Sequence, residues 1–176
     1  MAALVTQSNF WRFWLGGILI FAVMVAINPS LSVSGVEGGI PDIQAAGSAD
    51  RVDEIFAAWR NAGVFDFAKL SISLDLIFIG IYSFGAFCGA MLFRRMSLSA
   101  MRRLGSVVAA ATVIFFILDY VETACQFIQI MDGAGSDGLA ETSALVKPVK
   151  NISFIITFVG ILAGLMLQGR LNRVTK

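Results

Sequence analysis

The 176-residue sequence contains no histidine, two cysteines and three prolines, and only 14% of its residues are charged. Without histidine, haem held by imidazole, histidine-ligated di-iron clusters and zinc sites of the HExxH type are excluded. Cys88 and Cys125 lie in separate apolar segments without a CxxC pair. This argues against a quinone-linked disulfide generator and favours two buried packing residues. We expect no metal and no cofactor.

Apolar residues make up 57% of the chain and gather in four segments, near residues 10–28, 67–93, 106–131 and 147–168. Crossing a bilayer takes about 20 residues, so each segment predicts a membrane span. The fold class predicted is all-α, a four-transmembrane-helix bundle in one integral membrane domain over residues 1–176. The last span begins near Ser143 or near Pro148, depending on whether the proline takes the first helical position or kinks a longer helix.

The first apolar segment has two interpretations, because it begins close to the N-terminus. A cleaved signal peptide would have a similar length. Its flank, however, contains no lysine and only Arg12, which favours a retained helix that enters from the cytoplasmic side.

The uneven distribution of charge predicts an orientation. Residues 93–105 and 169–176 carry arginine or lysine without any acid, whereas residues 29–66 contain six acids against two bases. The positive-inside rule then places both termini in the cytoplasm and residues 29–66 outside. We expect a multi-pass protein of the bacterial inner (plasma) membrane.

The outer segment also predicts a short amphipathic helix. Apolar residues recur at helical spacing between Val52 and Trp59. Ser48 or Asp50 can cap its start, and Gly63 can end it. Such a helix either lies on the membrane surface or closes a lid over the bundle. Surface helices usually carry basic residues on their polar face, and this one is mostly acidic, which favours the lid.

Several polar side chains interrupt the apolar segments. Asp119, Glu122 and Gln126 are spaced i, i+3, i+7, so one face of the third span is polar and should turn toward other helices. Asp75 in the second span and Lys150 in the fourth should lie at a similar depth, in the outward half. The candidate pocket residues are Asp75, Tyr82, Asp119, Glu122, Gln126, Lys147, Lys150 and Asn151.

This polar cluster has two interpretations. It can be structural, with an acid–lysine pair that fixes the register of the helices. It can also be a pocket, reached from outside, that handles a proton or binds a ligand. Under either interpretation three acids face at most two bases, and three neighbouring carboxylates cannot all stay ionised in a low dielectric. At least one carboxyl group should hold a proton or bind a cation.

Short blocks in a fixed order carry a resemblance to a known family. They are residues 45–49 followed by Trp59, residues 73–78 with Tyr82, residues 118–122, and Lys150. The chain resembles a family of small bacterial four-helix integral membrane proteins over roughly residues 45–157. Members of that family usually have asparagine where this chain has Thr123. The resemblance implies the architecture and the choice of polar residues, and implies no activity.

Three functions follow from these observations, in decreasing order of support. The first is a module that binds or translocates a proton, a cation or an amphiphilic small molecule. The second is a membrane enzyme in which a buried acid, such as Asp75 or Glu122, acts on a lipid or isoprenoid substrate. The third is a structural subunit of a homo-oligomer or larger membrane complex, held through the GxxxG pairs at residues 85–89 and 160–164. The expected partners are the lipid bilayer and a lipid or small amphiphile, and no nucleic acid.

Overall fold

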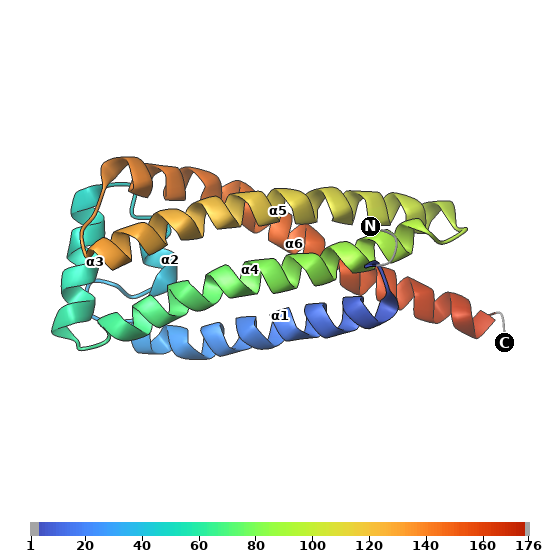
Figure 1. Cartoon of the computed structure of the whole chain (residues 1–176), viewed down its shortest axis with the longest axis horizontal. Helices are drawn as coiled ribbons and strands as arrows, with labels where there is room; N and C mark the ends of the chain where they lie inside the picture. Colours follow the sequence, from blue (N-terminus) through green and yellow to red (C-terminus); the bar gives the residue numbers. More distant parts are fainter. Residues whose placement is uncertain (1–3, 175–176) are drawn as a thin grey trace.

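The computed structural model describes residues 4–174. Four long helices run side by side along the molecule, and both ends of the chain lie at the same end of the bundle (Figure 1). A shorter helix crosses the opposite end. The predicted all-α four-helix bundle is confirmed. The helices in chain order are α1 (Gln7–Ile27), the 3-10 helix η1 (Asn28–Leu31), α2 (Ile40–Ile43), α3 (Ala49–Asn61), α4 (Phe65–Arg94), α5 (Ser99–Asp132) and α6 (Asp137–Val174).

The four long helices are each long and apolar enough to cross a membrane. Their outer faces expose large apolar side chains, for example Leu19 on α1, Ile117 on α5 and Ile155 on α6. Lipid tails would cover such a surface, whereas water would not. The fold is that of a multi-pass membrane protein.

Two helices begin earlier than the hydropathy pattern predicted. α5 starts at Ser99, so Arg102 and Arg103 belong to its first turns and not to a loop. α6 starts at Asp137, and Pro148 lies inside it. The helix thus begins before both predicted positions, and Pro148 lies inside a longer helix, which was one of the two alternatives. A proline removes one N–H from the helix ladder, but the turns on either side remain hydrogen-bonded, so the helix continues through it.

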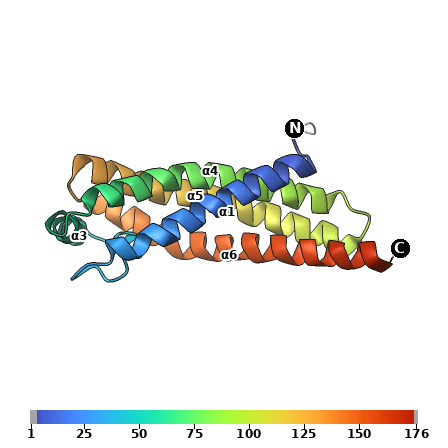
Figure 2. The ribbon, with the colours of Figure 1, turned by 90° about the horizontal axis from the view of Figure 1, so that it is seen from below.

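Helix α3 is the predicted amphipathic helix, and it closes one end of the bundle. Its apolar side chains, including Phe56 and Trp59, are fully buried against residues of α4, α5 and α6. The Ser48 hydroxyl accepts a hydrogen bond from the Arg51 amide, and Gly63 adopts a φ of 70° after the last turn. The capping residue, the glycine that ends the helix and the position of α3 across the end of the bundle agree with the predictions. Figure 2, in which α3 is seen end-on, shows that it lies across the long helices and not along them.

Hydrogen bonds between charged side chains and backbone hold α3 to the turn between α5 and α6. The Asp53 carboxylate accepts a hydrogen bond from the Gly135 amide at 2.6 Å, and the Asp137 carboxylate accepts one from the Ala49 amide at 2.7 Å. Asp53 of α3 thus lies at the N-terminal end of α6, and Asp137 of α6 lies at the N-terminal end of α3. A negative charge is favourable at both positions because the N-terminal end of the helix dipole is positive. Arg60 completes the contact by donating to the Gly133 carbonyl.

Glycines allow the long helices to approach each other closely within the chain. A Cβ atom at Gly85 would overlap the backbone of Trp14 on α1, and one at Gly160 would overlap Val108 on α5. The first residue of each GxxxG pair is therefore covered by another helix of the same chain, and so is Gly164, which lies against Phe93. These glycines are thus used in helix contacts within the chain.

We predict that Gly85→Ala destabilises the bundle, because the new methyl group forces α1 away from α4. The expected loss is about 1–3 kcal/mol in the free energy of unfolding. Gly138→Ala is the matched control, since nothing lies within 4 Å of a Cβ atom there. Thermal unfolding in detergent should show a lower midpoint for the first variant and an unchanged or higher one for the second. Equal midpoints would contradict the close contact.

Candidate functional site

The polar cluster predicted from the sequence centres on Lys150. The ammonium group of Lys150 lies 3.2 Å from Asp119 Oδ1 and donates a hydrogen bond to Glu122 Oε2. Lys150 is 6% exposed, Asp119 3% and Glu122 0%. Both acids lie on the same face of α5 because they are three residues apart, so one lysine of α6 reaches both. A buried ion pair of this kind fixes how α6 sits against α5.

Asp75 reaches the same level from α4 and is bound differently. The Thr123 hydroxyl donates a hydrogen bond to Asp75 Oδ2 at 2.9 Å. Among residues 4–170 no lysine or arginine lies within ion-pair distance of Asp75. Three carboxyl groups, from Asp75, Asp119 and Glu122, therefore lie near one ammonium group, which forms ion pairs with Asp119 and Glu122 only. The predicted convergence of the three helices at one depth is what the structure contains.

A cleft of about 550 Å³ opens beside this cluster. α1 and α6 form its sides, and η1 and α2 form its roof at the end closed by α3. The charged lining residues are Asp75, Asp119 and Lys150, whereas most other lining residues are apolar. Its full lining is Phe21, Met24, Val25, Asn28, Pro29, Ile40, Pro41, Gln44, Ser71, Asp75, Phe78, Phe115, Asp119, Lys150, Asn151 and Phe154.

Aromatic rings form the deep end of the cleft, one helical turn below the charges. Phe78 follows Asp75 by three residues, Phe115 precedes Asp119 by four, and Phe154 follows Lys150 by four. Because α4 and α6 run opposite to α5, all three rings fall on the same side of the charged residues. The ring centroids of Phe115 and Phe154 lie 5.4 Å apart. The site thus has a charged layer above an aromatic layer.

The remaining four predicted pocket residues lie in four different places. Asn151 lines the cleft and is exposed at its rim. Lys147 does not join the acids. Its ammonium group donates to the Pro41 carbonyl at 2.7 Å and so ties the roof of the cleft to α6. Gln126 is buried away from the cleft and donates to the Ser143 hydroxyl. Tyr82 lies beneath the aromatic layer, with its ring 5.2 Å from that of Phe78.

Some contributors to the site were missed in the sequence. Thr123 lies four residues after Asp119, so its spacing places it on the same helix face as that acid. Its contribution to the polar face could have been predicted from the sequence. Phe21 and Met24 on α1 had no such signal, because an apolar residue in a span reads the same whether it faces lipid or a cleft. The roof residues belong to an irregular segment without periodicity.

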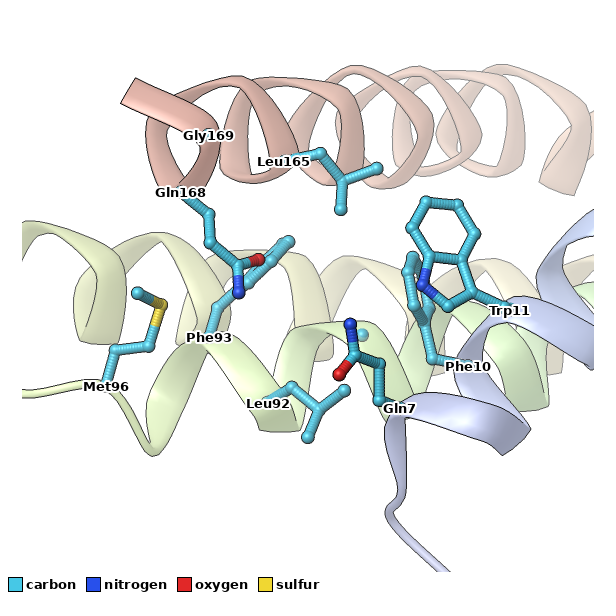
Figure 3. A pocket seen from close by; sticks show the side chains of 10 residues that line it. Gln7, Phe10, Trp11, Leu92, Phe93, Met96, Leu165, Gln168 and Gly169 are labelled. Atoms are coloured by element: carbon cyan, nitrogen blue, oxygen red, sulfur yellow. The ribbon is translucent and has the colours of Figure 1, made fainter. Parts of the chain in front are cut away.

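A second cleft, of about 360 Å³, lies at the opposite end of the bundle. Figure 3 shows the side chains of Gln7, on α1, and Gln168, on α6, pointing into this cleft from opposite sides, with Phe10 and Phe93 among the lining residues. None of its lining residues is charged. Two amides above apolar walls can hydrogen-bond a neutral group but provide no charge or proton chemistry. We therefore take the cleft beside Lys150 as the candidate site.

Comparison with known proteins identifies no relative. No protein-family model, no curated protein sequence and no solved structure matches the chain. The resemblance to small bacterial four-helix membrane proteins stays a prediction. The arrangement of the site itself is the basis on which function is argued.

We predict that Lys150→Met strongly destabilises the protein, because Asp119 and Glu122 lose the positive charge that compensates their burial. Removing one partner of a buried ion pair costs about 3–5 kcal/mol. Adding Glu122→Gln to Lys150→Met should recover part of this loss, since one uncompensated carboxylate is then removed. Thermal unfolding in detergent measures both effects.

Lys69→Met is the matched control for this experiment. Lys69 is a half-buried lysine at the start of α4, with its ammonium group 5.0 Å from the centre of the Phe65 ring. Such a contact contributes at most about 1 kcal/mol at a partly exposed site. Similar losses for the two lysine variants would show that the buried ion pair has no special role.

Proposed function

We propose that the protein binds an amphiphilic small molecule in the cleft beside Lys150, with the polar head at the charged layer and the apolar body along α1 and α6. The observation that carries this proposal is the composition of the cleft. It combines the buried side chains of Asp75, Asp119 and Lys150 with a mainly apolar wall in one space of about 550 Å³. Sites for small ligands have this size and this mixture of apolar walls and few polar groups.

The position of the cleft supports access from the lipid phase. Its sides are α1 and α6, two helices that can cross a membrane, and its rim residues Val25 and Asn151 are exposed. Helix α3 is hydrogen-bonded across the end of the bundle, so that end is closed. A molecule already dissolved in the bilayer can enter between α1 and α6 without crossing water.

We further propose that the α3 end faces outward and that both termini are cytoplasmic, in a bacterial inner membrane. The support is the charge distribution. Arg94 and Arg95 end α4, Arg102 and Arg103 begin α5, and all four lie at the end opposite α3. Basic residues next to spans are retained in the cytoplasm. The cleft would then open in the outer leaflet.

One observation favours a second candidate, an enzyme acting on a lipid or isoprenoid. Asp75 and Asp119 both face an apolar cleft, where a carboxyl group can act as a general acid on a bound molecule. The described side chains contain no group of three or more potential metal ligands, and within residues 4–170 no hydrogen bond joins Ser71, the serine of the cleft, to Asp75, Asp119 or Lys150. Binding therefore ranks first. A purely structural subunit ranks last, because the glycine faces suited to helix association are used inside the chain.

We predict that a photoactivatable single-chain alcohol, with a diazirine in its tail, labels the cleft saturably in reconstituted vesicles. The labelled positions should include Phe21, Met24 and Val25 of α1 and Phe154 of α6, because these line the apolar part. Excess unlabelled alcohol should remove this labelling but not the general labelling of lipid-facing side chains. Mass spectrometry of peptides measures both.

Two variants on neighbouring positions sharpen this test. Asn151→Trp fills the mouth of the cleft and should abolish most of the saturable labelling. Ile152→Trp places the same ring on the exposed face of α6, outside the cleft, and should leave the labelling unchanged. Labelling that cannot be saturated, or that responds equally to both variants, would refute the binding function.

We predict the orientation of the chain from the same charges. In intact cells a membrane-impermeant maleimide should label Ser34→Cys, in the segment between α1 and α3, and should label Ser97→Cys only after permeabilisation. Both serines are exposed, whereas Cys88 and Cys125 are buried and should react slowly in the unchanged chain. The reverse pattern would place the cleft at the cytoplasmic leaflet.

A further inference from the structure

We infer that the amphiphile bound in the cleft carries a positively charged head group, an amine or ammonium, that pairs with Asp75. This inference rests on the proposed binding function and adds the chemical class of the ligand. The juxtaposition that carries it is an acid that forms no ion pair with any lysine or arginine of residues 4–170, one helical turn above a layer of aromatic rings, with both facing the same cleft.

The first support is the charge balance of the site. Lys150 is engaged by two carboxyl groups, those of Asp119 and Glu122. Asp75 is 8% exposed and lines the cleft, and its only hydrogen bond within residues 4–170 is the one that Thr123 donates to Oδ2. Its other oxygen, Oδ1, therefore has an unused acceptor site beside the cleft. A buried carboxyl group is either neutralised by a proton or paired with a positive charge, and a cationic head group in the cleft would provide the second.

The second support comes from the aromatic layer, independently of the acids. Phe78, Phe115 and Phe154 line the cleft one helical turn below Asp75, Asp119 and Lys150. Residues three or four apart on a helix are about 5–6 Å apart. This spacing brings Phe78 next to Asp75 on α4, and aromatic rings attract a positive charge placed over their face within roughly 6 Å. The aromatic layer therefore favours a positive head group at Asp75 over a negative one.

The same arrangement selects against the lipids that surround the protein. A phosphate group in the cleft would meet Asp75 and Asp119, and Lys150 is already shared by two carboxyl groups. Like charges at close range disfavour such a partner. The size of the cleft, about 550 Å³, suits one compact molecule or a single chain. Bulk two-chain anionic phospholipids are therefore poor occupants.

The test is a competition against the saturable photolabelling by the alcohol, with full-length protein in neutral phosphatidylcholine vesicles. Three competitors share one dodecyl tail and differ only in the head: dodecyltrimethylammonium, dodecanol and dodecyl sulfate. Competition is compared at equal mole fraction in the membrane, measured after sedimenting the vesicles. We expect the ammonium compound to compete at about tenfold lower mole fraction than the alcohol, the lower end for a close charge pair. The sulfate should compete more weakly than the alcohol.

Within the Asp75→Asn variant, the ammonium compound should lose its tenfold advantage over dodecanol, so that the two heads compete at similar mole fractions. The asparagine carbonyl can still accept the hydrogen bond from Thr123, so the fold around it is retained. Asp66→Asn is the matched control, because it removes the same charge from an exposed position on the same helix. It should keep the full advantage.

The outcomes separate the inference from the function on which it rests. Saturable labelling with equal competition by all three heads, or with preference for the sulfate, overturns the cationic ligand and leaves the binding function standing. Equal behaviour of Asp75→Asn and Asp66→Asn likewise overturns it. Absence of any saturable labelling overturns the binding function itself.

Discussion

The contact on which the rest of the structure depends is the buried ion pair between Lys150 and the acids of α5. A charge inside a membrane protein must be compensated within the protein, because lipid tails provide neither water nor counter-ions. Lys150 meets Asp119 and Glu122, and this fixes the rotation and depth of α6 against α5. Asp75 is brought to the same level by Thr123. These contacts between α4, α5 and α6 hold Asp75, Asp119 and Lys150 at one depth, and the cleft opens beside them.

Much of this arrangement was predictable, and the reasons are physical. Long apolar segments identify the spans, and charged residues inside them must face other helices and not lipid. Asp119, Glu122 and Lys150 could therefore be assigned to one cluster from the sequence alone. The start of α6 could not be predicted, because a proline such as Pro148 often marks a helix boundary in a sequence. In the structure the helical turns on both sides of Pro148 are formed, and the helix continues through it. The cleft itself could not be predicted either, since Phe21 and Phe154 are indistinguishable in sequence from lipid-facing residues.

The roof of the cleft illustrates how an irregular segment is kept in place without periodicity. Asn28, directly after α1, accepts a hydrogen bond from the Ile40 amide at 3.0 Å and donates one to the Gly38 carbonyl at 3.1 Å. Gly39 adopts a φ of 66°, and a Cβ atom there would meet the Asn28 side chain. The Asn28 side chain therefore fixes the turn that covers the charged layer. Lys147 of α6 holds the same segment further along, through its hydrogen bond to the Pro41 carbonyl.

Under the proposed binding function, the opening of the cleft between α1 and α6 determines how the bound fraction of the protein would depend on the amount of amphiphile present. A receptor whose opening faces hydrocarbon samples what is dissolved in the leaflet, where an amphiphile is enriched relative to the surrounding water. Saturation would then follow the mole fraction of the compound among the lipids, so that a tenfold change in aqueous volume at constant lipid would scarcely alter it. Tail length, which sets partitioning, would act on apparent affinity even where it makes no additional contact with the protein.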